Sequence, residues 1–213
     1  SSVILNGANK DIFNYSNSDD KIRNKLKIVT HHWSTHINKG FEMYNHLDNL
    51  LNDKKLSEKI SFTFIGNLPK NFKFKNTNYI EPKNGLELAN LIKIHDVYLT
   101  GSINEPGGNH QNEGLNCGLP VLYLESGCMS EYCRGYGIVY SKNSLKEKIY
   151  EIREEYNNFR DKLKSYPYNS DLMCKNYENI FIELIKNKNE IIKNRKLPKT
   201  NFISKLKFKF NLK

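Results

Sequence analysis

The chain has 213 residues, of which 38% are hydrophobic and 26% charged, as expected for a globular protein large enough to bury a core. No apolar run approaches the roughly 18 residues of a membrane span, and Ser1-Ser2-Val3-Ile4 has no basic region ahead of a long apolar segment. We therefore expect a cytoplasmic protein, or one peripheral to a membrane. The four cysteines have neither zinc-ligand nor C-x-x-C spacing, so we expect free thiols.

The net charge of +10 lies almost wholly in the last part of the chain, where ten Lys or Arg residues between 186 and 213 stand against one acid, Glu190. The rest of the chain is close to neutral, which argues against a nucleic-acid-binding face. We interpret 187–213 as a basic tail. Apolar residues alternate with lysines over 199–213, so the tail is either solvated, which we favour, or an amphipathic contact to anionic lipid.

Residues 1–25 are rich in Asn, Ser and Asp and are predicted to be a linker that leads into the domain. Beyond it, short β-branched and aromatic runs predict strands, and apolar residues three and four apart predict helices. The predicted strands are 26–30, 61–65, 78–80, 96–100, 120–124 and 137–140. The predicted helices begin at Phe41, at an Asn84 cap, at Asn112, near Met129, at a Ser144/Glu147 capping box that continues to Leu163, and near Met173.

Strands and helices alternate along residues 26–186. This order predicts an α/β domain, Rossmann-like and doubly wound, with a mostly parallel sheet and helices on both faces.

The stretch from Thr100 to Ser126 has the strongest functional pattern. Between two predicted strands, Pro106-Gly107-Gly108 forms a turn that is followed by a short helix. In such a unit the free amides of the turn point to one spot beyond the strand's carboxyl end, which favours an anion such as pyrophosphate. Glu105 and Glu113 flank this spot. Phosphate repels carboxylates, so we expect these acids to bind neutral hydroxyls, which sugars supply.

Glu105-x7-Glu113, followed by Gly114-Leu115-x-Cys117-Gly118-Leu119-Pro120-Val121, resembles the E-x7-E signature of the family-four retaining glycosyltransferases, which have the GT-B fold. Val3 to Asn9 with Phe13 resembles the segment that opens the second domain of that family. Lys39-Gly40 resembles its lysine-glycine pair near the donor pyrophosphate. The three matches occur in the family's order.

The resemblance implies that this chain is the donor-binding half of a GT-B fold, and it assigns roles to the residues that match. Lys39 would bind the diphosphate, Glu113 the ribose, and Glu105 the donor sugar or its developing positive charge, so Lys39 and Glu105 are the catalytic candidates. The remaining donor-binding candidates are Pro82 near the base and the loop residues Gly107, Gly108, Asn109 and His110.

The chain departs from the family near Trp33 and Ser34, where an arginine is usual. His31, His32, His36 or Arg134 are open alternatives for that second cation. No D-x-D pair flanks a strand, so we expect no metal and no cofactor besides the substrate, a nucleotide-diphosphate sugar such as a UDP- or GDP-sugar.

The function that this pattern predicts is transfer of a sugar, with retention, to a glycan or lipid-linked acceptor. The resemblance implies an N-terminal acceptor-binding domain or subunit as a partner. The alternative is a non-catalytic module that binds a nucleotide or nucleotide sugar. The presence of both Glu105 and Glu113 favours the enzyme, because a retired site has no reason to keep either acid.

Overall fold

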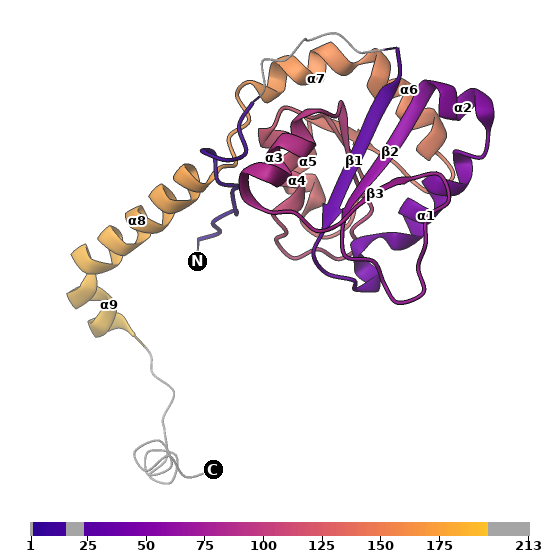
Figure 1. Cartoon of the computed structure of the whole chain (residues 1–213). Coiled ribbons are helices and arrows are strands. Elements are labelled where there is room, and N and C mark those ends of the chain that lie inside the picture. Colours follow the sequence, from indigo (N-terminus) through magenta and orange to yellow (C-terminus); the bar gives the residue numbers. More distant parts are fainter. Residues whose placement is uncertain (1, 16–23, 196–213) are drawn as a thin grey trace, which may run out of the picture. The chain divides into compact units, whose positions relative to one another are not determined.

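The computed structural model describes residues 2–15 and 24–195 (Figure 1). Its contacts divide the chain into two compact units, Ser1–Cys174 and Lys175–Lys213, which we describe separately. The predicted division into a linker (1–25), a domain (26–186) and a tail (187–213) stays a prediction, and the possible lipid contact at 199–213 lies outside the described residues.

The first unit is built on a parallel sheet. Its six strands are β1 (Leu26–His32), β2 (Ile60–Gly66), β3 (Asn78–Ile80), β4 (Val97–Thr100), β5 (Val121–Tyr123) and β6 (Gly137–Val139). Their order is β3-β2-β1-β4-β5-β6, and every neighbouring pair is parallel. The predicted Rossmann-like, doubly wound fold is thus confirmed, and the sheet is entirely rather than mostly parallel.

Alternation along the strands divides the core into two layers, because successive side chains of a strand point to opposite faces. In β4, Val97 and Leu99 join one apolar cluster and Tyr98 joins the other. β5 follows the same rule, with Leu122 on one face and its two neighbours on the other. Both faces are buried, as is usual for a parallel sheet.

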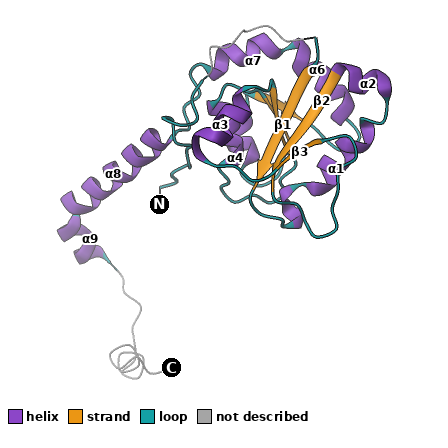
Figure 2. Ribbon diagram, viewed as in Figure 1, coloured by secondary structure: helices purple, strands orange, loops and turns teal. Residues whose placement is uncertain are grey.

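Helices cover both faces (Figure 2). The helices of the sheet-containing unit are η1 (Ile37–Lys39, a 3₁₀ turn), α1 (Phe41–Leu50), α2 (Lys54–Lys59), α3 (Gly85–Lys93), α4 (His110–Asn116), α5 (Met129–Cys133), α6 (Leu145–Glu154) and α7 (Tyr156–Leu163). Buried residues of α1, α2 and α6 pack in one cluster, and those of α3, α4 and α5 in the other. Helix α8 (Ser170–Lys186) begins in this unit and ends in the second, which also contains α9 (Lys188–Asn194).

The prediction of a single helix from Ser144 to Leu163 is wrong. The structure has two helices, α6 and α7, separated at Glu155. The apolar spacing continues across this break, with Ile149 and Ile152 buried on α6 and Phe159 on α7, so it could not reveal the interruption.

The two predicted side-chain caps are also wrong. Neither Ser144 nor Asn84 makes a side-chain capping hydrogen bond to its helix. The Ser144 hydroxyl instead accepts from the backbone N–H of Ser141, at 2.9 Å.

Part of the predicted N-terminal linker packs into the core. Ala8 and Phe13 are buried, with 1% and 6% of their surface exposed. The backbone N–H of Ser170 donates to the Ala8 carbonyl at 2.8 Å. Ala8 and Phe13 therefore pack in the core, and Ile12 and Phe13 line the cavity described below.

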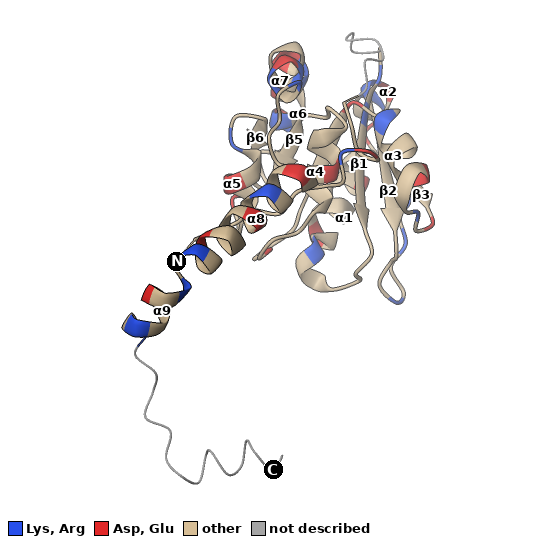
Figure 3. Cartoon of the chain, turned by 90° about the vertical axis from the view of Figure 1, so that its left-hand side faces the viewer, with Lys and Arg blue, Asp and Glu red and all other residues tan. Residues whose placement is uncertain are grey.

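Charged positions of both signs are interspersed along α7 and α8 (Figure 3). Over residues 2–15 and 24–195, no helix combines the length and the apolar character that crossing a bilayer requires.

Candidate functional site

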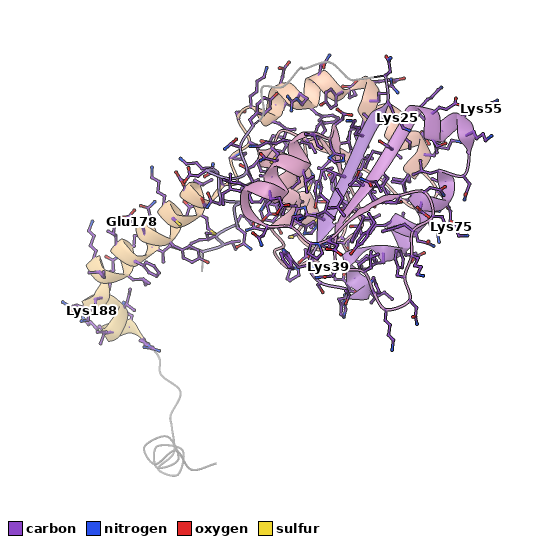
Figure 4. All side chains as sticks on the ribbon, in the orientation of Figure 1. Lys25, Lys39, Lys55, Lys75, Glu178 and Lys188 are labelled. Atoms are coloured by element: carbon purple, nitrogen blue, oxygen red, sulfur yellow. The ribbon has the colours of Figure 1, made fainter. Side chains whose placement is uncertain are left out.

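The strand order reverses between β1 and β4, and ligands of open α/β sheets bind beyond the carboxyl ends of the strands at such a point. A cavity of about 380 Å³ lies there. Figure 4 places Lys39 at this end of the sheet. The cavity is lined by Ile12, Phe13, His31, His32, Trp33, Ser34, Lys39, Asn84, Gly85, Leu88, Gly108, Asn109, His110 and Glu113.

A second cavity, of about 310 Å³, shares Ser34 and Lys39 with the first. It is lined by Ser34, His36, Asn38, Lys39, Ile103, Asn104, Glu105 and Pro106. The two acids of the motif thus line neighbouring cavities, Glu113 the larger and Glu105 the smaller. Lys39 is the one Lys or Arg residue among those that line either of them.

Local backbone geometry places Lys39. The His36 ring accepts from the Asn38 N–H at 3.2 Å and so caps η1, which ends at Gly40 in a left-handed conformation with φ of 89°. A Cβ atom on Gly40 would lie 2.3 Å from the Gly101 backbone, so only glycine lets the two segments approach. The approach sets Lys39 beside Glu105, with Nζ 2.5 Å from Oε2. The side chains are 24% and 8% exposed.

The glycine turn after Glu105 is held from two sides. The Gly107 carbonyl accepts from the Asn6 side chain at 2.6 Å, and a Cβ atom on Gly108 would lie 2.8 Å from Glu105 Cδ. Of the predicted donor-binding loop residues, Gly108 and Asn109 line the larger cavity, whereas Gly107 lines neither of the two cavities.

Glu113 is positioned by close packing of α4 on the sheet. A Cβ atom on the next residue, Gly114, would lie 2.5 Å from the Tyr98 ring, so the helix rests directly on β4. The Glu113 Oε2 atom lies 2.6 Å from His31 Nε2. The Glu113 side chain remains 20% exposed and faces the larger cavity.

Three buried histidines gather behind the cavity, a feature that the sequence reasoning missed. The ring centroids of His32 and His110 are 4.6 Å apart, and those of His31 and His110 are 6.4 Å apart. His32 Nε2 lies 2.6 Å from the Tyr44 hydroxyl, and His110 Nε2 lies 2.9 Å from Thr100 Oγ1. Burial lowers the pKa of both His32 and His110 well below 6.5, so these rings are neutral.

The structure shows where each of the four alternatives to the arginine usual in the family lies. His32 is neutral and bonded to Tyr44, and the His36 ring caps η1. Arg134 lines a different cavity, with Gly135, Tyr136, Lys162 and Ser165. His31 reaches the larger cavity but places Nε2 on Glu113.

Pro82 lies in a shallow depression beside the larger cavity and shares His31, His32 and Trp33 with it. The same loop continues to Asn84 and Gly85, which line the cavity itself. The loop after β3 is therefore at the site, although the proline is not in the cavity wall.

Within the described ranges, no three His, Cys, Asp or Glu side chains converge in a way that could hold a metal ion.

The four cysteines are free thiols. Cys117, Cys128 and Cys133 are buried and Cys174 is exposed.

The free energy of unfolding is expected to fall as the pH decreases below about 6.5, where unfolded histidines bind protons. Folded His32 and His110 stay neutral at this pH because their pKa values are depressed, so acid favours the unfolded chain by up to about 1.4 kcal/mol per histidine and pH unit. Urea denaturation between about pH 5 and 7.5 measures this slope.

His110→Gln should reduce the dependence of the free energy of unfolding on pH. The control His46→Gln, at a half-buried histidine outside the cluster, should not, and an unchanged slope in His110→Gln would contradict the assignment.

The parallel sheet, its order and the site at the reversal define the class of fold: this is one Rossmann-like half of a GT-B fold. Sucrose-phosphate synthase from Thermosynechococcus elongatus matches with a TM-score of 0.66 and 16% identity, over 87% of this chain and 53% of that one. The pneumococcal O-GlcNAc transferase GtfA matches with a TM-score of 0.63 and 15% identity, over 85% of this chain and 38% of that one. This chain thus spans about half, or less, of the length of these two proteins.

A third match is to an isolated C-terminal domain, and it agrees with the assignment of one half of a GT-B fold. The C-terminal domain of the group 1 family glycosyl transferase LpcC from Francisella tularensis has a TM-score of 0.57 and 17% identity, over 80% of this chain and 98% of that one. No protein-family model matches the chain, and no curated sequence is significantly similar to it. At these identities the likeness establishes the fold.

Proposed function

We propose that this chain is the donor-binding domain of a retaining, metal-independent glycosyltransferase that uses a nucleotide-diphosphate sugar. One observation carries the proposal: Lys39, Glu113 and the glycine-rich loop line a single cavity at the point where the strand order reverses. The structural neighbours that are glycosyltransferases support it.

In this proposal Lys39 binds the diphosphate. The Lys39 side chain is 24% exposed and lines both cavities, so it can meet a charged group that lies across their junction. As the sugar leaves the nucleotide, negative charge grows on the departing diphosphate. A cation fixed beside that charge stabilises the transition state.

The two acids bind hydroxyls in the proposal. Glu113 accepts from the ribose, because a carboxylate can take two donors at once. Glu105, in the adjoining cavity, faces the donor sugar or the positive charge that develops on it. The acceptor is a glycan or a lipid-linked molecule held by an N-terminal acceptor-binding domain or subunit.

Calorimetric titration with UDP, GDP, ADP and their sugars tests the proposal. We expect at least one nucleoside diphosphate to bind and to raise the melting temperature, because a ligand that binds only the folded state stabilises it. Failure of all three diphosphates and their sugars to bind would refute the proposal.

Glu113→Ala is expected to weaken binding of that diphosphate about 10- to 150-fold, because hydrogen bonds to a charged partner contribute about 1.5–3 kcal/mol. The control is Glu42→Ala, which removes another ion-paired glutamate, here paired with Lys142 at an exposed position on α1. The control should bind as the unaltered protein does. Equal affinity in Glu113→Ala would count against the ribose assignment.

A further inference from the structure

Tyr98, His31 and Glu113 form a hydrogen-bonded chain at the wall of the larger cavity. Tyr98 lies in the middle of β4 with 0% exposure, and its hydroxyl is 3.0 Å from His31 Nδ1. The other ring nitrogen, Nε2, is 2.6 Å from Glu113 Oε2. His31 is itself 4% exposed. Both ring nitrogens are therefore occupied, one by a group in the core and one by a group that faces the cavity.

The partners fix where the protons lie. A carboxylate only accepts hydrogen bonds, so the proton on the Glu113 side is carried by His31 Nε2. The Tyr98 hydroxyl stays protonated, since burial raises its pKa well above 10, and it lies 3.0 Å from His31 Nδ1. The same phenolic oxygen accepts the backbone N–H of His31 at 3.3 Å. The contacts thus connect Tyr98 in the core, through the His31 ring, to Glu113 at the cavity.

We infer that His31 and Tyr98 are positioning residues that hold Glu113 for recognition of a ribose, and so make the site selective for ribonucleotides over 2′-deoxyribonucleotides. This inference rests on the proposed function. His31 holds Oε2, and among the described residues no hydrogen bond reaches Oε1, which leaves that oxygen for a ligand hydroxyl. A carboxylate held by one oxygen has a fixed orientation and discriminates between neighbouring hydroxyls better than a rotating one.

Packing supports the same role. The absence of a side chain at Gly114 lets α4 pack directly on the Tyr98 ring. Tyr98 and Glu113, the two ends of the hydrogen-bonded series, are therefore held in place relative to each other. The His31 ring also meets the Tyr98 ring edge-on, with centroids 5.7 Å apart. The imidazole therefore has little freedom to turn away from Glu113.

The experiment compares each nucleoside diphosphate with its 2′-deoxy counterpart by calorimetry, and uses inorganic pyrophosphate as a probe of the phosphate contact alone. The informative variants are His31→Leu, which removes the donor, and His31→Gln, whose amide can still donate toward Glu113. Tyr98→Phe removes only the hydroxyl, and His46→Leu is a histidine control outside the cluster. Far-ultraviolet circular dichroism reports whether each variant is folded.

The unaltered protein is expected to prefer the ribonucleotide, and His31→Leu to lower that preference about tenfold while pyrophosphate binding stays the same. His31→Gln and His46→Leu should keep most of the preference. Tyr98→Phe should lower it less than His31→Leu does. If His31→Leu does not fold, Tyr98→Phe decides, since an unchanged preference there overturns the inference.

Other outcomes separate this inference from the proposed function. Diphosphate binding without any ribose preference would overturn the inference and leave the diphosphate site standing. A folded His31→Leu with an unaltered preference would do the same. Absence of binding by every diphosphate and its sugars would refute the proposed function itself. Parallel loss of pyrophosphate and nucleotide binding in His31→Leu would mean that the histidine only maintains the fold, which also overturns the inference.

Discussion

Lys39→Ala is expected to weaken nucleoside-diphosphate binding about 100-fold. The substitution removes the one lysine that lines the two cavities, and it leaves Glu105, whose side chain is 8% exposed, without its lysine partner and, in the proposed site, close to the phosphates. Removing one member of a buried charged pair typically costs 2–5 kcal/mol, about two orders of magnitude in affinity. Calorimetric titration measures the loss.

Two further variants make this result specific. Lys142→Ala removes another lysine that is paired with a glutamate, Glu42, but both side chains are more than half exposed, and it should bind normally. The double variant Lys39→Ala/Glu105→Gln should bind better than Lys39→Ala, because the unpaired carboxylate no longer repels the phosphates. Normal binding by Lys39→Ala would rule out the lysine as the diphosphate contact.

Gly40→Ala is expected to lower the free energy of unfolding by about 4 kcal/mol, at the upper end of single substitutions. An alanine there would need a φ of 89° and would bring its Cβ atom within 2.3 Å of the Gly101 backbone. One of these segments must then move, and Lys39, which directly precedes Gly40, moves with it. We therefore also expect weaker diphosphate binding in any folded fraction. Urea denaturation at neutral pH measures the stability.

Gly135→Ala is a close control for this experiment. Gly135 has nearly the same φ, 88°, but no atom lies within 4 Å of the position of its Cβ. Alanine there carries only the cost of the left-handed conformation, about 1–2 kcal/mol. The difference between the two variants isolates the contact with Gly101. Similar losses of stability in both would show that the close approach of Gly40 to Gly101 has no energetic weight.

The fold could be predicted because its signals are local. Each strand is a short apolar run that ends at a polar or glycine residue, and the alternation of strands with helices selects a parallel sheet. Two predictions about helix ends failed because residue type and spacing do not determine the local hydrogen bonds. Ser144 has the residue type of a cap, yet its hydroxyl bonds Ser141. The apolar residues of α6 and α7 keep their helical spacing across Glu155, so spacing alone could not show the break.

The site could be predicted only in part, because its chemistry depends on contacts between distant segments. The sequence identified Lys39, Glu105 and Glu113, but not that Lys39 pairs with one acid and His31 with the other. His110 was predicted only as one of the donor-binding loop residues, and the sequence did not show that its ring is buried, with Nε2 2.9 Å from Thr100 Oγ1. The available signal was two adjacent histidines at the end of β1 and a third ten positions beyond the end of β4. Spacing does not show which rings will meet.

The contact between Lys39 and Glu105 gives the site an internal counterion. A simple monovalent anion such as chloride gains little from an ammonium that already has a carboxylate at 2.5 Å. A diphosphate carries several charges and can share the ammonium with the carboxylate or displace it, so it gains more. We therefore expect the Glu105 carboxylate to make the site bind multivalent anions in preference to the monovalent anions of the surrounding solution.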